Sequence, residues 1–183
     1  MKRSRALIRF GRHALLCAVF AGCAGRNLAP PPDVPPSLRA PADQVMSLAL
    51  RGAGVQVYEC QATQDRVARF AWVLRGPEAD LTDHSGKTVG RHYAGPTWEA
   101  DDGSTVAGEI VAQEPSPNPD AMPWLLLRAT SNAGKGLFAK TRSIQRLHTV
   151  GGKAPGSGCD ATQLRKHVRV AYSADYYFYV ARR

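Results

Sequence analysis

The densest group of chemically capable side chains lies in residues 92–104, which read HYAGPTWEADDGS. The stretch contains a histidine, three carboxylates and Trp98, the residue types used for general acid–base catalysis, for a hard cation or for ligand stacking. The alternative is structural, because Asp-Asp-Gly is typical of a tight turn and Trp98 then packs in the core. The carboxylates lack calcium-loop spacing, and no second acidic cluster follows. We favour the turn and keep a hydrolase or lyase site around His92, Glu99 and Asp101 as the alternative.

The histidines are scattered, without an H-E-x-x-H or H-x-H pair. His92 and His148 could meet across strands and bind zinc with Glu99, but a neutral, hydrogen-bonded histidine is the commoner case. SGKT at residues 85–88 imitates the end of a phosphate-binding loop, yet Leu81 stands where the first glycine is required. No G-x-G-x-x-G follows a strand pattern either. We therefore predict no metal, no cofactor and no nucleotide, and assign no catalytic residue.

Aromatic side chains crowd the C-terminal segment YSADYYFYV. Neighbouring residues of a strand point to opposite faces, so Tyr177 and Tyr179 share one face and Tyr176 and Phe178 share the other. One face packs inside, and the other could stack on a sugar or contact a protein. The alternative is that the tyrosines merely bridge core and solvent.

Arg146 alternates with Leu147 and is therefore expected on the same face as His148. If that face is the interior, the guanidinium needs a carboxylate partner, for which Glu99 and Asp175 are the candidates. The candidate ligand-binding residues are His92, Trp98, Glu99, Asp101, Arg146, His148, Tyr177 and Tyr179.

Short alternating segments separated by turn residues follow from residue 44 to the end of the chain. Glycines at residues 52–54 and the Arg-Gly-Pro at residues 75–77 are interpreted as breaks between strands. A short helix is expected only near residues 162–166. The pattern predicts a single antiparallel all-β domain over residues 44–183, with about eight to nine strands arranged as a barrel or a sandwich.

The first 22 residues carry five basic residues and no acid, and end in the short apolar run ALLCAVFAG. This is typical of a secretory signal, too short for a permanent anchor. The run ends in Phe20-Ala21-Gly22-Cys23, which resembles a bacterial lipobox. This resemblance predicts lipidation of Cys23 and a place in the cell envelope, at the outer membrane or in the periplasm. The alternative is ordinary cleavage without a lipid. Removing the five basic residues from 24 leaves 19 against 15 acidic ones, a dispersed excess of four that does not argue for nucleic acid.

Residues 23–43 are predicted to form a stalk, because residues 27–43 hold six of the 13 prolines. Proline fixes φ and removes a donor, so this segment favours an extended polyproline helix of about 3.1 Å per residue.

Cys60 and Cys159 are the thiols that remain after the signal and the lipid site. In an oxidising envelope such a pair is more often joined than free. We predict a disulfide that closes a loop of about 100 residues. The alternative, a catalytic thiol, needs an activating partner that the sequence does not identify.

Five separated strings occur in the chain: GVQVYEC, HYAGPTWEADDGSTVAGE, PWLLLRAT, IQRLHTVGGKAP and YSADYYFY. Together with the two cysteines they resemble domain-of-unknown-function family 3455 over residues 42–180. The resemblance implies a secreted β-domain without an established activity.

Two functions from different classes remain. The first is a non-catalytic envelope lipoprotein, attached to the membrane by its N-terminal lipid, that binds a glycan, a small apolar ligand or an envelope protein. The second is the hydrolase or lyase, for which the carboxylates and histidines must converge in one pocket. We favour the binding domain.

Overall fold

The computed structural model describes residues 32–64 and 69–183. The predicted signal, the lipidation site Cys23 and the beginning of the stalk lie outside these residues. The described chain is an antiparallel all-β domain whose strands close into one barrel. The prediction of the fold class is confirmed. Of the two predicted arrangements, the structure is a barrel and not a sandwich.

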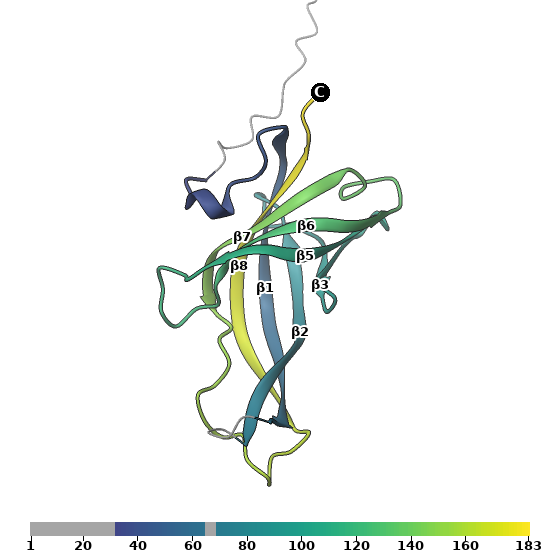
Figure 1. Ribbon diagram of the computed structural model, residues 1–183. Helices are drawn as coiled ribbons and strands as arrows, with labels where there is room; N and C mark the ends of the chain where they lie inside the picture. The colour runs from purple at the N-terminus through teal and green to yellow at the C-terminus, as the bar shows by residue number, and fades with distance from the viewer. Residues whose placement is uncertain (1–31, 65–68) are drawn as a thin grey trace, which may run out of the picture.

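Eight strands pair in chain order, and the last strand returns to the first. In Figure 1 the long strands β1, β2 and β8 run the height of the molecule, while β5, β6 and β7 cross at one end. The strands are β1 (Gln44–Ala62), β2 (Phe70–Thr82), β3 (Thr88–Tyr93), β4 (Thr97–Ala100), β5 (Thr105–Glu114), β6 (Trp124–Ala133), β7 (Thr141–Gly151) and β8 (His167–Ala181).

Strand β1 is continuous through residues 52–54, where the sequence predicts a break. Both glycines of this stretch are needed for close approach inside the barrel. A Cβ on Gly52 would lie 2.5 Å from the ring of Tyr176, and one on Gly54 would lie 2.1 Å from the carbonyl oxygen of Glu78. The glycines therefore mark tight packing within a strand, which a sequence pattern does not distinguish from a turn.

Strand β2 also continues through its predicted stop at residues 75–77. Arg75 is an extra residue in the β1–β2 ladder, where Gly76 and Leu74 pair with successive residues of β1. Pairing with β3 begins only at Glu78, directly after Pro77. Proline has no N–H to donate, so it is confined to strand edges and bulges. The first half of β2 is therefore an edge on its β3 side.

Alternate side chains of the strands fill the barrel. The largest fully buried ones include Trp98, Tyr176 and Phe178, and Phe138 joins them from the connection between β6 and β7. The Trp98 ring lies edge-on to both Tyr176 and Phe178, with centroid separations of 5.6 and 6.0 Å. Offset and edge-to-face contacts of this kind are favoured between aromatic rings. The barrel core is thus built around one aromatic cluster.

The segment before β1 packs against the outside of the barrel. Its single 3-10 turn, η1 (Pro36–Leu38), places Leu38 with Val34 against Leu126 and Leu147. Two apolar side chains of the proline-rich stretch thus lie on an apolar strip of β6 and β7. No helix among the described residues is long and apolar enough to cross a membrane.

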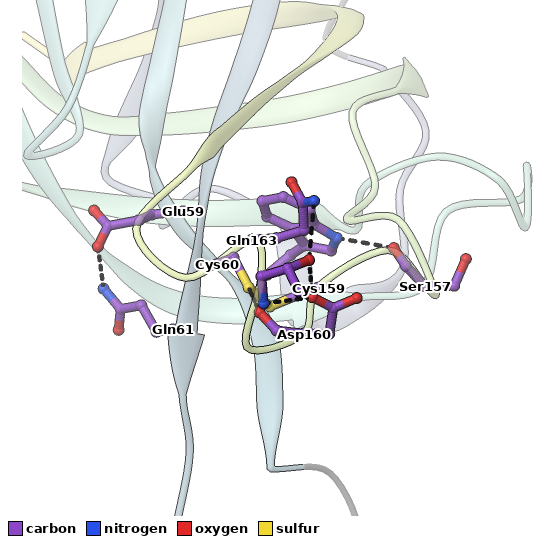
Figure 2. Close-up of a disulfide and its surroundings, with 9 residues drawn as sticks. Glu59, Cys60, Gln61, Ser157, Cys159, Asp160 and Gln163 are labelled. Atoms are coloured by element: carbon purple, nitrogen blue, oxygen red, sulfur yellow. Dashed lines mark hydrogen bonds between the residues drawn. A yellow bond between two sulfur atoms is a disulfide. The ribbon is translucent and has the colours of Figure 1, made fainter.

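The predicted disulfide between Cys60 and Cys159 is confirmed, with Cα atoms 5.4 Å apart. It joins β1 to the long connection between β7 and β8, as Figure 2 shows. The Cys60 amide donates to the carbonyl of Lys166, and the Arg165 amide donates to the carbonyl of Cys60. The helix expected near residues 162–166 is instead a series of turns at this junction.

Candidate functional site

The sheet separates the polar side chains of residues 92–104. His92 on β3 and Trp98 on β4 are paired across the ladder and face the interior, where their rings stack with centroids 4.3 Å apart. Glu99 faces outward and accepts hydrogen bonds from Arg91 (3.0 Å) and from the Tyr93 hydroxyl (2.9 Å). Because His92 and Glu99 lie on opposite faces, the acid–base site considered above is not assembled.

The Asp-Asp-Gly sequence forms the tight turn between β4 and β5, as favoured above. Asp102 accepts hydrogen bonds from the amides of Ser104 and Leu137, each at 2.8 Å. The Ser104 hydroxyl, together with these two amides, holds the pKa of the Asp102 carboxyl below its ordinary value. Gly103 adopts φ of 79°, the left-handed conformation that such a turn requires. Asp101 and Asp102 are both exposed.

Replacing Asp102 by alanine is expected to lower the free energy of unfolding by about 1 to 1.5 kcal/mol, since two backbone amides at an exposed turn lose a charged acceptor. Asp101→Ala is the matched control, for which a change within about 0.5 kcal/mol is expected. Denaturant unfolding of both variants measures the difference. Equal effects at the two positions would contradict the structural role of Asp102.

Arg146 and His148 lie on opposite faces of β7, so the prediction that they share a face is wrong. Leu147 pairs with Asp175 and Val150 with Ser173, which leaves two residues of β7 in a bulge. His148 takes φ of 48° in that bulge, and its side chain turns outward. A β-bulge reverses the alternation of faces, which sequence periodicity cannot anticipate.

His148 belongs to a group on the outer surface. Its Nδ1 lies 3.0 Å from Asp175 Oδ2, and its ring packs on Trp124 and Tyr177. Asp175 also pairs with Arg51 at 3.4 Å. This arrangement satisfies the imidazole and the carboxylate within the protein. It fixes the bulge to β8.

Tyr176 and Phe178 face the barrel interior, and Tyr177 and Tyr179 face outward, as the alternation predicts. Tyr179 is nevertheless buried, because the segment before β1 covers it. Its hydroxyl donates to Gln145 Oε1 at 2.6 Å, and burial raises its pKa to about 12. The outward pair is therefore not an open aromatic surface.

One end of the barrel interior contains a cavity of about 220 Å³. Its mouth lies where β2 and β5 run as edges beside the β3–β4 turn. Leu74 and Ile110 line this mouth, with exposed fractions of 51% and 56%. The inner wall is formed by Gln56, His92, Trp98, Leu125, Leu127, Arg146 and Tyr176.

Arg146 has no carboxylate partner among residues 32–64 and 69–183. Its Nε and Nη2 donate to a single acceptor, the carbonyl of Pro123, at 3.3 and 2.9 Å. The two carboxylates proposed from the sequence, Glu99 and Asp175, are engaged on the outside of the barrel. Burial lowers the pKa of the Arg146 guanidinium, since desolvation disfavours its charged form.

Two further polar atoms at the cavity wall are buried and have no hydrogen-bond partner in the described part of the chain. They are Gln56 Oε1 and Trp98 Nε1, on side chains that are each 1% exposed. Buried polar groups are nearly always hydrogen-bonded, so unpaired ones call for an explanation. The Gln56 carbonyl is an acceptor and the Trp98 indole is a donor.

His92 presents a neutral ring to the same cavity. Its Nδ1 lies 2.8 Å from the carbonyl oxygen of Thr97, which can only accept, so Nδ1 carries the hydrogen and Nε2 is an acceptor. Burial lowers the pKa of His92 to about 3, with a smaller contribution from the positive charge of Arg146. The ring therefore stays uncharged near neutral pH.

Tyrosines surround the guanidinium. Burial raises the pKa values of Tyr58, Tyr172 and Tyr176, so these hydroxyls remain protonated and supply no negative charge to Arg146. Tyr58 donates to the carbonyl of Gly152 at 2.6 Å. Sequence reasoning missed Tyr176 and Gln56 as site residues. The inward alternation of positions 54, 56 and 58 was an available signal for Gln56.

A larger groove of about 540 Å³ lies on the outer face of β1 to β4. Two ion pairs occupy it: Arg91 with Glu99 at 3.0 Å, and Arg169 with Glu78 at 2.5 Å. Among the described residues, no three His, Cys, Asp or Glu side chains gather closely enough to hold a metal ion. The interior cavity is the stronger candidate site, because within the described residues its cation has no carboxylate partner and two of its hydrogen-bonding atoms have no partner.

Comparison with known proteins agrees with the strings noted in the sequence. The family described as "Protein of unknown function (DUF3455)" matches residues 41–180. No curated protein and no solved structure matches the chain. The match extends from the residues before β1 into the end of β8 and includes every residue of the interior cavity. The chain therefore belongs to the DUF3455 family.

Proposed function

We propose that this protein is a cell-envelope lipoprotein whose barrel binds a small organic anion. The observation that carries the proposal is Arg146, a half-buried arginine that lines a cavity and has no carboxylate partner among the described residues. A buried charge is normally paired, because leaving water costs several kcal/mol per ion. An anionic ligand would supply the missing partner.

The chemistry of the guanidinium favours a carboxylate. Arginine presents donors in a rigid fork that matches carboxylate oxygens, and such charge-assisted bonds are about twice as strong as neutral ones. Nε and Nη2 of Arg146 already donate to Pro123. The donors of Nη1 and the Trp98 indole N–H remain for the ligand.

The cavity limits the size of the ligand. At about 30 Å³ per water molecule, 220 Å³ corresponds to roughly seven waters. An apolar cavity of about 150 Å³ is enough for benzene. The cavity thus suits one ring or a short chain with its carboxylate, and not a glycan of several sugars.

The proposed location rests on the N-terminal sequence. A basic segment, a short apolar run and the Phe20-Ala21-Gly22-Cys23 sequence support export and lipidation at Cys23. The disulfide agrees with an oxidising compartment. Mass spectrometry of the mature N-terminus tests this part, since an N-terminal residue other than a diacylated Cys23 would contradict it.

Isothermal titration of the full chain, in an uncharged detergent, with benzoate, hexanoate and uncharged benzyl alcohol tests the anion site. We expect both carboxylates to bind to the unmodified chain. Arg146→Gln should lower the affinity for them about 30-fold or more, since the charged partner of the ligand is lost. Arg146→Lys keeps the positive charge but lacks the paired donors of the guanidinium, and it should lower the affinity for the carboxylates about tenfold. Arg142→Gln, an exposed arginine of the same strand, is the matched control.

Two results would contradict the proposed function. One is the absence of binding of either carboxylate to the unmodified chain. The other is carboxylate binding of equal strength in the chain with Arg146→Gln. Circular dichroism and the melting temperature establish that each variant is folded.

A further inference from the structure

We infer that the ligand is an aromatic carboxylate that also carries a hydrogen-bond donor such as a hydroxyl group. This inference rests on the proposed function and names its ligand class. It is argued from the hydrogen-bond acceptors of the cavity wall, whereas the proposed function is argued from the positive charge of Arg146. The two parts can therefore fail separately.

The first acceptor is the side-chain amide of Gln56 on β1. The residue is 1% exposed, lines the cavity, and its Oε1 has no partner among the described residues. An amide oxygen has two lone pairs and cannot donate. A carboxylate facing it would be repelled, so the ligand needs a donor at this place.

The second acceptor is His92 Nε2. The bond from Nδ1 to the Thr97 carbonyl fixes the tautomer, and burial keeps the ring neutral. No hydrogen bond to Nε2 occurs within the described residues. The inner wall thus offers two acceptors from β1 and β3 and one cation from β7. A ligand that satisfies all three carries an anionic group and a donor.

The remaining wall favours a flat ring. His92 and Trp98 stack with ring planes 6° apart, and the Tyr176 ring stands at 67° to His92. Leu125 and Leu127 complete the apolar part of the wall. Aromatic rings gain from edge and offset contacts with such side chains beyond their area burial. A rigid ring also loses little conformational entropy on binding.

The experiment compares benzoate with the three hydroxybenzoate isomers by titration calorimetry on the full chain. We expect at least one isomer to bind about 3- to 10-fold more tightly than benzoate, the range of one net hydrogen bond. In Gln56→Leu the ratio of the affinity for that isomer to the affinity for benzoate should fall to within about twofold. Gln113→Leu, an exposed glutamine on β5, is the matched control.

His92→Phe provides a second variant, since it keeps the aromatic stack and removes the acceptor. A preference for one isomer that is lost in Gln56→Leu or in His92→Phe supports the inference. It is overturned if no isomer exceeds benzoate, or if the preference persists in both variants. In those cases benzoate binding that depends on Arg146 would leave the proposed function standing. Failure of all carboxylates to bind would overturn both.

Discussion

Replacing Cys60 and Cys159 together by alanine is expected to lower the free energy of unfolding by about 4 to 5 kcal/mol. The bridge spans 99 positions of the chain, and a loop of about 100 residues gives roughly this value when loop closure in the unfolded chain dominates. For a domain of this size the melting temperature should fall by about 10 to 20 °C. Calorimetry of the variant and of the reduced wild-type chain should give the same shift.

Removal of the disulfide should also destabilise one region in particular, because the bridge anchors the connection between β7 and β8 to β1. Figure 2 shows Cys60 on the strand and Cys159 with Asp160 on the connection. Hydrogen exchange should show reduced protection of the Arg165 amide, which donates to the Cys60 carbonyl at 2.8 Å. A melting temperature within about 3 °C of wild type would contradict the stabilising role.

Acidification should destabilise the protein well before its carboxylates titrate. His92 has a folded pKa of about 3 and an ordinary value of 6.5, so the unfolded chain takes up the proton first. The stabilising contribution is complete above pH 6.5 and is lost as the pH falls toward 3. This linkage predicts that the free energy of unfolding falls by about 2 kcal/mol between pH 7.5 and pH 5, and by about 4 kcal/mol in total by pH 3.

His92→Phe is the control for this pH dependence. It preserves the stack on Trp98 and the edge contact with Tyr176 but removes the titrating nitrogen, so its unfolding free energy should change little between pH 7.5 and pH 5. Below about pH 4.5, carboxylates with lowered pKa values such as Glu59 and Glu99 add their own loss. Denaturant unfolding at each pH measures the slope. A wild-type slope equal to that of His92→Phe from pH 7.5 to 5 would contradict the assignment.

Some features of the site could be predicted because they depend on local rules. The alternation of side chains along a strand separates Tyr176 from Tyr177, and the turn preference of Asp-Asp-Gly places Asp102 between two strands. The prediction of the disulfide followed from the number of thiols and from the expectation of an oxidising compartment. Each of these depends on a few neighbouring residues or on a count.

Other features needed the tertiary structure. Glycines such as Gly52 signal a turn in the sequence, but the packed Tyr176 ring is what requires a missing Cβ. The bulge at His148 changes the face of the sheet on which the side chains of β7 lie, and it is recognised only from the register between β7 and β8. The burial of Val34 depends on its packing against Leu126 and Leu147, which are far from it in the sequence. In each case the deciding contact joins residues far apart in the chain.

The sequence by itself determined the antiparallel all-β class, the disulfide and the family, because alternation, thiol count and ordered strings are properties of the chain alone. The tertiary structure decided the barrel and the candidate site. Closure of β8 on β1 brings Gln56, His92, Trp98 and Arg146 from four strands to one cavity. Whether a charged side chain is paired depends on what the opposite strands place beside it, and within the described residues Arg146 meets tyrosines and no carboxylate.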